Sequence, residues 1–319
     1  MRYRKLIVCL LLCALVGLLA FRFTGGQEDR VRIALVLKTT VETAEFWGEV
    51  LDGVDSAVEE LGVEVTVTGS DSESAVDQQI AVMEEVIATR PDAIILVASD
   101  YDRLVDVTRE AVAAGIDVIT MDSDVNTDVR TTFVASDNYE IGRSLGAQLL
   151  ENLDSGPVAI LTHSSYSSSG IQRVEGALDA LAECPDVEVV GVYDCENSRD
   201  NAAAIARELL EQYPDLRGFV CANEVCNLAV AQVLTEQGLG GQLTVVGCDN
   251  SRQQIQYLEQ GVIQSIIIQQ PFNMGYAAVE QAVRVVRGQS VPAFTEIPCV
   301  TITQDNMYNS DNQKLLFPF

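Results

Sequence analysis

The sequence has few of the residues that metal binding, nucleic-acid binding or histidine-based catalysis requires. It contains one histidine, His163, and its 20 lysine and arginine residues are outnumbered by 47 aspartate and glutamate residues. The net charge of −27 repels phosphate backbones, so we expect no nucleic-acid partner. One histidine, with a Cys221 to Cys226 spacing too wide for a zinc knuckle, gives no basis for a metal site. We expect neither a metal nor a cofactor.

Signals for an enzyme are equally sparse. His163 precedes the serine-rich stretch 164–169, which suggests a nucleophile, but a catalytic triad also needs a carboxylate that orients the histidine. The stretch has too few glycines for a phosphate-binding loop of the Walker type. We therefore predict that residues 164–169 form a loop at the edge of a cleft, and that the protein is not an enzyme.

The chain has no long low-complexity stretch, and its 319 residues are enough for two domains. Because 48% of the residues are hydrophobic, there are enough apolar side chains to fill two cores, and a disordered body is excluded. The acidic surface is then interpreted as a feature that keeps the protein soluble.

The N-terminus carries the one long apolar run. Residues 1–5 hold three basic side chains, and residues 6–21 hold no charge. A basic start followed by an apolar segment predicts export, with the positive end left inside the cell. Leu18 is too large for a good signal-peptidase site, which favours an uncleaved membrane anchor; a cleaved signal is the alternative. We expect residues 1–30 to be a signal or anchor with a linker, and the body to be extracytoplasmic.

Beyond residue 30, apolar strand-like runs alternate with amphipathic helical runs. Val31–Leu37 is followed by a helical pattern over Glu45–Leu61, which Gly62 ends, and then by the strand-like run Glu64–Val67. The alternation continues to about residue 287. This order predicts an α/β fold made of doubly wound, Rossmann-like parallel sheets with right-handed crossovers.

The same local plan occurs twice. Pro91-Asp92 and Pro214-Asp215 each precede a strand-like run, a helix, a glycine-bearing turn and a second strand-like run. The second run ends at Asp122 in one copy and at Asp249 in the other. We therefore predict two similar lobes that face each other across a cleft and close on a ligand about a hinge.

Polar residues directly follow six of the strand-like runs, namely Lys38, Ser99, Asp122, Asn223, Asp249 and Gln269. In open parallel sheets ligands bind outside the carboxyl ends of the strands, so we expect these residues to converge on the cleft. The predicted helices after Asp122, Asn223 and Asp249 give a second interpretation, in which these three cap helix N-termini.

Seven short motifs lie in one order between residues 31 and 300: Leu37–Thr39 with Phe46-Trp47, Val118–Asp122, Ala135–Asn138, Arg173–Gly176, Ala222–Glu224, Val246–Asp249 and Gln269–Pro271. In these motifs the chain resembles the type 1 periplasmic binding proteins of sugar transporters, in the ribose/allose/galactose group. The resemblance implies a three-segment hinge near 136–138, 269–271 and 291–294. It implies an N-terminal lobe of residues 31–136 plus 270–292 and a C-terminal lobe of residues 137–269 plus 293–319.

The same resemblance implies the ligand-binding residues Lys38, Phe46, Trp47, Asp122, Arg173, Asn223, Asp249 and Gln269. Carboxylates would accept hydroxyl protons of a sugar, amides would both donate and accept, and an aromatic ring would cover the apolar sugar face. Other members of this set also have an alternative role: Lys38 could be a solvated surface side chain, one of Phe46 and Trp47 could be ordinary core, and Arg173 could form a purely structural ion pair.

Departures from the family pattern leave the ligand open. Ala44 and Glu45 stand where the family usually has a ligand-binding Asn and a Pro, and Ile171 replaces a sugar-clamping Arg. The implied function is that of an extracytoplasmic solute-binding protein, acting as a monomer, that captures a sugar or polyol and delivers it to an ABC importer. The alternative is a membrane-anchored sensor that presents ligand to a chemoreceptor or histidine kinase. A sugar-responsive repressor would need an N-terminal helix-turn-helix where this chain is apolar.

The cysteines of the body fall into two groups. Cys184 and Cys195 flank one strand-like run and could form a disulfide, which export permits. Cys221, Cys248 and Cys299 lie in apolar strand-like runs, where reduced cysteine is a common small hydrophobe.

Overall fold

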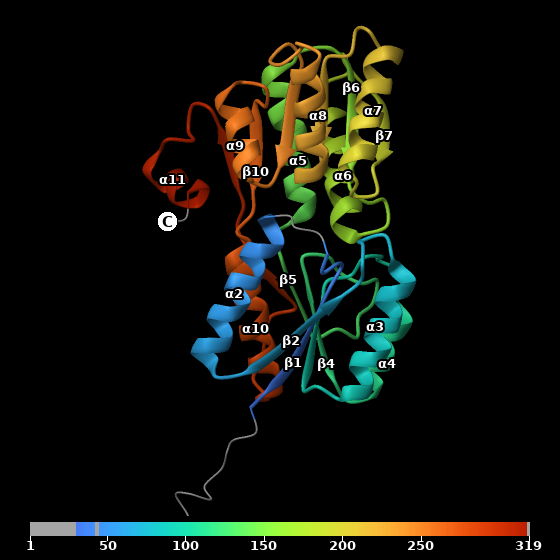
Figure 1. Ribbon diagram of the computed structural model, residues 1–319, viewed down its shortest axis with the longest axis vertical. Coiled ribbons are helices and arrows are strands. Elements are labelled where there is room, and N and C mark those ends of the chain that lie inside the picture. Colours follow the sequence, from blue (N-terminus) through green and yellow to red (C-terminus); the bar gives the residue numbers. More distant parts are fainter. Residues whose placement is uncertain (1–29, 42–44, 318–319) are drawn as a thin grey trace, which may run out of the picture.

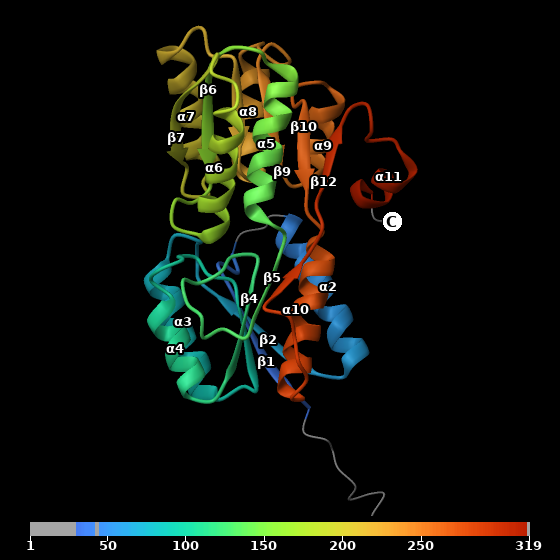
Figure 2. The same cartoon turned by 180° about the vertical axis from the view of Figure 1, so that it is seen from behind.

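The computed structural model describes residues 30–41 and 45–317, and it has the predicted α/β architecture of two lobes (Figure 1). Each lobe contains one six-stranded sheet with helices on both faces, and the lobes are stacked along the long axis of the molecule (Figure 2). The predicted signal or anchor within residues 1–30 lies outside the described residues except for Arg30. Among the helices of the described part, none combines the length and the apolarity that a membrane span needs.

The N-terminal lobe is built on a sheet with the strand order β11-β5-β4-β3-β1-β2. Its strands are β1 (Arg32–Leu37), β2 (Glu64–Gly69), β3 (Ala93–Leu96), β4 (Asp117–Met121), β5 (Thr132–Ala135) and β11 (Phe294–Glu296). All of its strand pairs are parallel. One face is covered by α2 (Glu45–Leu61) and α10 (Pro271–Val286), and the other by α3 (Val76–Thr89) and α4 (Val105–Ala113).

The C-terminal lobe has the strand order β12-β10-β9-β8-β6-β7. Its strands are β6 (Gly156–Thr162), β7 (Val187–Asp194), β8 (Gly218–Cys221), β9 (Thr244–Cys248), β10 (Ser265–Ile268) and β12 (Val300–Thr303), the last antiparallel to β10. One face packs against α5 (Asn138–Asn152) and α6 (Ser168–Leu181), and the other against α7 (Arg199–Gln212), α8 (Glu224–Glu236) and α9 (Arg252–Glu259). The helix α11 (Ser310–Leu316) follows β12.

Residue type decides which strands lie in the middle of each sheet. β3 is four apolar residues long and every one of them is buried, as expected for a parallel strand that is covered on both faces. β2 alternates threonine with valine and exposes three of its six residues, so it forms an edge of its sheet. The apolar runs of the sequence therefore place both cores between sheet and helices.

The two lobes repeat one plan, as the sequence predicts. In sheet order, β2-β1-β3-β4-β5 of the first lobe correspond to β7-β6-β8-β9-β10 of the second. Each lobe also has a pair of closely packed helices with glycines at the crossing. A Cβ on Gly53 of α2 would lie 2.0 Å from the carbonyl oxygen of Phe272 in α10, and a Cβ on Gly142 of α5 would lie 2.1 Å from that of Arg173 in α6. Only glycine permits this approach.

The chain passes between the lobes three times. The first two passages lie between β5 and α5 and between β10 and α10. The third lies between β11 and β12, after Glu296, and not at the predicted residues 291–294. The difference arises because Phe294 pairs with Phe133 of β5, with their rings 5.5 Å apart, which keeps β11 in the N-terminal sheet.

The suggested Cys184–Cys195 disulfide is absent. All six cysteines of the described part are free. Cys184 lies before β7 and its thiol contacts the carbonyl of Asp154, whereas Cys195 lies after the other end of the same strand. Eight strand residues separate the two, and a strand of that length holds them too far apart to bond. Cys195 instead contacts Cys226.

The lobes touch each other beside the hinge passages. The amide of Tyr101 donates to the carbonyl of Tyr166 at 2.8 Å, and the hydroxyls of Ser123 and Ser169 are 2.8 Å apart. On the side of the molecule where α2 and α9 meet, the amide of Arg252 donates to the carboxylate of Glu45 at 3.3 Å (Figure 1). These contacts between lobes define a closed arrangement.

Candidate functional site

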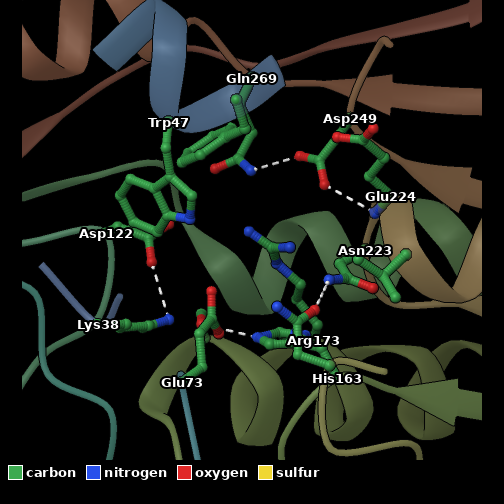
Figure 3. Close-up of a pocket in the computed structure, with 14 residues that line it drawn as sticks. Lys38, Trp47, Glu73, Asp122, His163, Arg173, Asn223, Glu224, Asp249 and Gln269 are labelled. Atoms are coloured by element: carbon green, nitrogen blue, oxygen red, sulfur yellow. Dashed lines mark hydrogen bonds and ion pairs between the residues drawn. The ribbon is translucent and has the colours of Figure 1, made fainter. Parts of the chain in front are cut away.

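A cavity of about 440 Å³ lies between the lobes, where the carboxyl ends of both sheets meet (Figure 3). The structure brings all eight predicted ligand-binding residues to this cavity: Lys38, Phe46, Trp47, Asp122, Arg173, Asn223, Asp249 and Gln269. The rest of its lining comes from Glu73, His163, Ser169, Asn197, Glu224 and Val225. Contact of the eight residues with a ligand stays a prediction.

Ser99, the sixth strand-end residue, does not line the cavity. The side chain of Gln79, which is fully buried, fills the notch between the ends of β1 and β3. Its amide group donates to the carbonyls of Leu37 and Val97 and accepts the amide hydrogen of Ser99. This plug turns the chain after β3 away from the cleft, so five of the six strand ends converge.

Lys38 and Asp122 form the floor of the cavity in the N-terminal lobe. The ammonium of Lys38 lies 3.2 Å from Asp122 Oδ2, and both residues are at least 95% shielded from solvent, with exposures of 2% and 5%. The hydroxyl of Ser123 donates to the same carboxylate oxygen at 3.0 Å. Asp122 Oδ1 has no partner in these contacts and is the atom of this pair left to accept a ligand hydroxyl.

Asp249 has the corresponding place in the C-terminal lobe. Its Oδ1 accepts a hydrogen bond from the amide of Gln269 at 2.9 Å, and its Oδ2 accepts one from the backbone N–H of Glu224 at 2.9 Å. The carboxylate is thus held in one orientation by two donors from different segments of the chain. Because the carboxylate is already held in place, binding a ligand costs less conformational entropy than ordering a mobile side chain would.

Asp122 and Asp249 share an unusual backbone conformation. Their φ angles are 60° and 76°, in the left-handed region. Aspartate adopts this conformation more readily than most residues, yet it still carries strain. The same strain at the ends of β4 and β9 turns one carboxylate from each lobe toward the shared cavity.

Of Asp122, Asn223 and Asp249, only Asn223 caps a helix N-terminus. Asn223 is the N-cap of α8, because its side-chain oxygen accepts the amide hydrogen of Cys226. Its Nδ2 donates to Asn197 at 2.9 Å. α9 is capped by Ser251 and not by Asp249, and no helix of the described part has Asp122 as its N-cap.

The aromatic side chains line the cavity on the N-terminal side. Phe46 and Trp47 start α2 and their rings meet edge to face, with centroids 4.9 Å apart. Trp47 is 8% exposed and also belongs to the core beneath α2, so it combines packing with a surface on the cavity. Phe46 is half-buried against the same core.

Arg173 connects the hinge to the second lobe. Its Nε donates to Asn138 at 2.9 Å and its Nη1 donates to the carbonyl of Ala222 at 2.8 Å. Asn138 in turn donates to the carbonyl of Asp122 at 3.3 Å. The ion pair suggested as the alternative role is not among these contacts; the guanidinium orients the first hinge segment and also lines the cavity.

Comparison with known proteins agrees with this geometry. A family profile described as periplasmic binding protein domain matches residues 33–290. The chain belongs to this family of periplasmic binding proteins. The match covers most of both lobes and all of the cavity.

Two curated periplasmic binding proteins are similar along nearly the whole chain. The D-allose-binding periplasmic protein of Escherichia coli K12 is 24% identical over 286 residues, which are 85% of this chain and 91% of the relative. The D-ribose/D-allose-binding protein of Pseudomonas aeruginosa is 26% identical over 297 residues, 90% of this chain and 92% of the relative. By their names, both relatives are sugar-binding proteins.

A solved structure extends the likeness to the fold. The carbohydrate transporter solute-binding protein from Agrobacterium radiobacter, in complex with D-arabinose, superposes with a TM-score of 0.87 at 26% identity. The alignment covers 91% of this chain and the whole of that chain. The type 1 periplasmic binding protein fold expected from the sequence is therefore confirmed, and membership of this family implies an extracytoplasmic location.

Besides Ser169, which belongs to the stretch predicted at the edge of the cleft, sequence reasoning missed four polar residues of this periplasmic binding protein's cavity: Glu73, His163, Asn197 and Glu224. The internal repeat could have found one of them, His163. His163 follows β6 as Lys38 follows its counterpart β1. Asn197 follows β7 as Glu73 follows its counterpart β2. Glu73 and Asn197 lie several residues beyond their strands, where the strand-end rule does not reach.

His163 is neutral in the cavity. Burial lowers the pKa of its imidazole well below the ordinary value, and the nearby positive charges of Lys38 and Arg173 lower it further. Its Nε2 is 3.4 Å from the hydroxyls of Ser167 and Ser169, whereas Nδ1 has no hydrogen-bond partner among the residues that the structure describes.

Two glutamates carry raised pKa values. Burial raises the pKa of the Glu73 carboxyl, and the charge of Asp122 adds to this, while Lys38 and a hydrogen bond from Trp47 lower it. Burial, reinforced by the charge of Asp249, raises the pKa of Glu224 from 4.5 to about 7. Near neutral pH, Glu224 can therefore offer a ligand either a donor or an acceptor.

One sequence pattern of hydrolases is present but has no catalytic geometry. Gly142–Gly146 reads G-x-S-x-G, yet the whole stretch lies inside α5. A nucleophile elbow instead needs a sharp turn between a strand and a helix. The serines after His163 lead into α6: Ser167 is its N-cap, and Ser168 and Ser169 are its first two residues.

Proposed function

We propose that this protein captures a neutral sugar or polyol in the cavity between its lobes and delivers it to the membrane permease of an ABC importer. One observation carries this proposal: equivalent strand ends of the two lobes aim Asp122 and Asp249 into one cavity beside the ring of Trp47. Sugars present paired hydroxyls and an apolar face of C–H groups, and this lining offers partners for both.

The charges of the cavity favour a ligand without net charge. Lys38 is already paired with Asp122, and the carboxylate of Asp249 already holds two donors. A neutral ligand can share these groups without leaving a charge unpaired in a dry site, which would be costly. The names of the relatives, which bind D-allose and D-ribose, support the same class of ligand.

Placement outside the cytoplasmic membrane, in the periplasm or on the outer face of the cell membrane, is part of the proposal, as is action as a monomer. The alternative is a membrane-anchored sensor that presents the ligand to a chemoreceptor or histidine kinase. The observation that favours it is the apolar run 6–21 without a good cleavage site. The N-terminal sequence of the exported protein separates the two: a retained run favours the sensor, and its removal favours the importer.

A thermal-shift screen tests the class of ligand. The exported protein is melted with monosaccharides, polyols, amino acids and nucleosides at equal concentrations. A ligand at 100 times its Kd stabilises the folded state by about 2.7 kcal/mol, which raises Tm by roughly 5 °C or more. We expect such a shift from a monosaccharide or polyol. A shift from amino acids or nucleosides alone would contradict the proposal.

A further inference from the structure

Two cysteines far apart in sequence meet in the interior of the C-terminal lobe. The sulfur atoms of Cys195 and Cys226 are 3.2 Å apart, although 31 positions separate the residues. Both side chains are fully buried. Cys195 directly follows β7, and Cys226 lies in the first turn of α8.

The backbone on both sides holds the two sulfurs in place. The amide of Cys195 donates to the carbonyl of Thr162 at the end of β6, at 2.9 Å, and the amide of Cys226 donates to the side chain of Asn223 at 3.1 Å. A disulfide has an S–S distance of about 2.05 Å, so a closure of roughly 1 Å joins the pair.

We propose that Cys195 and Cys226 form a disulfide in the exported protein, and that this bond fixes the rim of the cavity. The proposal rests on the extracytoplasmic location of the family, where disulfides form and persist, and not on the identity of the ligand. It replaces the Cys184–Cys195 pairing suggested by sequence.

The bond forms during folding by two thiol–disulfide exchanges with a disulfide-bearing oxidoreductase of the same compartment. The thiolate of one cysteine attacks the carrier's disulfide, which forms a mixed disulfide and releases one carrier thiolate. The thiolate of the second cysteine then attacks the first cysteine's sulfur and releases the other carrier thiolate. Two thiols of this chain are oxidised, one carrier disulfide is reduced to a dithiol, and the two protons pass to the carrier thiolates.

Two residues that line the cavity lie close to this pair in sequence. Asn197 is two residues after Cys195, Asn223 is three residues before Cys226, and the two side chains are joined by a hydrogen bond of 2.9 Å at the cavity. Glu196 and Asn197 have left-handed φ angles of 53° and 51°, so this turn is strained. A covalent link beneath the turn holds it in the conformation that presents Asn197.

Peptide mapping of the wild-type protein tests the bond. Cells are quenched in acid, free thiols are blocked under denaturing conditions without reductant, and the chain is cleaved after glutamate. This cleavage places Cys195 in peptide 189–196, Cys226 in 225–236, Cys184 in 184–188 and Cys221 in 212–224. We expect peptides 189–196 and 225–236 to be linked, with the thiols of Cys184 and Cys221 blocked. Blocked thiols in both expected peptides, or a link to 212–224 instead, would overturn the proposal.

Variants test the consequence for the rim. Reduction of the wild-type protein should lower Tm by at least about 5 °C, because a link across 31 positions restrains the unfolded chain. The double variant Cys195→Ala/Cys226→Ala should have a lower Tm than the oxidised wild-type protein, and reductant should not change it. The control variant Cys184→Ala should lose stability on reduction as the wild type does. Hydrogen exchange at the amide of Asn197 should become about tenfold faster on reduction, with β9 unchanged. A wild-type Tm and exchange rate that reductant leaves unaltered would contradict the structural role, and the mapping decides the case even where the double variant fails to fold.

Discussion

The ammonium of Lys38 lies 3.2 Å from the carboxylate of Asp122, and both side chains are shielded from solvent at the ends of β1 and β4. The sequence places these residues 84 positions apart. Parallel strand order brings them together, and the low exposure of the pair makes it far more sensitive to loss of one partner than a surface ion pair is.

Removal of the positive partner should therefore destabilise the protein. Lys38→Met leaves Asp122 buried with only neutral donors and should cost about 3–5 kcal/mol of unfolding free energy. Lys314→Met is the matched control, because Lys314 pairs with Asp311 at 2.9 Å while both side chains are at least 75% exposed. Urea denaturation of the two variants measures the contrast. Equal, small losses in both would mean that Lys38 and Asp122 are solvated like a surface pair.

The carboxylates should carry much of the ligand affinity. Asp122→Ala and Asp249→Ala each remove acceptors in a dry cavity and should weaken binding by about 1–3 kcal/mol, or roughly 5- to 150-fold. Asp106→Ala, which changes a side chain that is fully exposed on α4, should leave Kd unaltered. Calorimetry with the sugar selected by the thermal screen gives the three constants. Binding within twofold of wild type in both cavity variants would place the ligand elsewhere.

The raised pKa of Glu224 predicts a pH dependence of stability. Because the folded-state pKa is about 7 and the ordinary value is 4.5, the folded protein binds the proton more tightly. Its contribution is fully present below pH 4.5 and is lost as pH rises through 7. Tm measured from pH 5 to 8 should fall more steeply for wild type than for Glu224→Gln. Parallel Tm curves would exclude an elevated pKa at this position.

Much of this site follows from the sequence through one geometric rule. Parallel strands end at one edge of a sheet, so Lys38, Asp122 and Asp249 could be placed together from their positions after apolar runs. The rule fails for Ser99 because Gln79, a residue within a helix, fills the notch between two strand ends. Nothing in the local pattern around Gln79 marks it as a plug.

Other features depend on contacts between distant segments. β11 is only three residues long and two of them are exposed, so its pairing with β5 leaves no periodic signal in the sequence. The meeting of Cys195 with Cys226 likewise depends on how β7 and α8 pack, and not on spacing. His163 was within reach of sequence reasoning, since the internal repeat makes it the counterpart of Lys38.

Contacts between the lobes predict that the closed form depends on ligand. Hydrogen bonds such as those of Tyr101 with Tyr166, Ser123 with Ser169 and Arg252 with Glu45 join the lobes directly, and ligand bound to both walls should add to the preference for closure. Small-angle scattering should give a smaller radius of gyration with saturating sugar than without it. An unchanged radius would indicate that the lobes do not open.

Trp47 offers the most direct test that a sugar occupies this cavity, because it is the only tryptophan in the chain. Its ring lines the cavity while packing on the core of α2, so binding and packing must be measured on the same variants. Trp47→Ala should weaken binding by about 2 kcal/mol or more, and Trp47→Phe should lose less because most of the stacking area survives.

The decisive measurement is a titration of Trp47 emission with the sugar that raises Tm. Ligand over the indole displaces water from it, so the emission should change and saturate with one site, at the Kd that calorimetry gives. Emission that stays constant at saturating sugar, together with normal affinity and a lowered Tm in Trp47→Ala, would contradict sugar binding in this cavity.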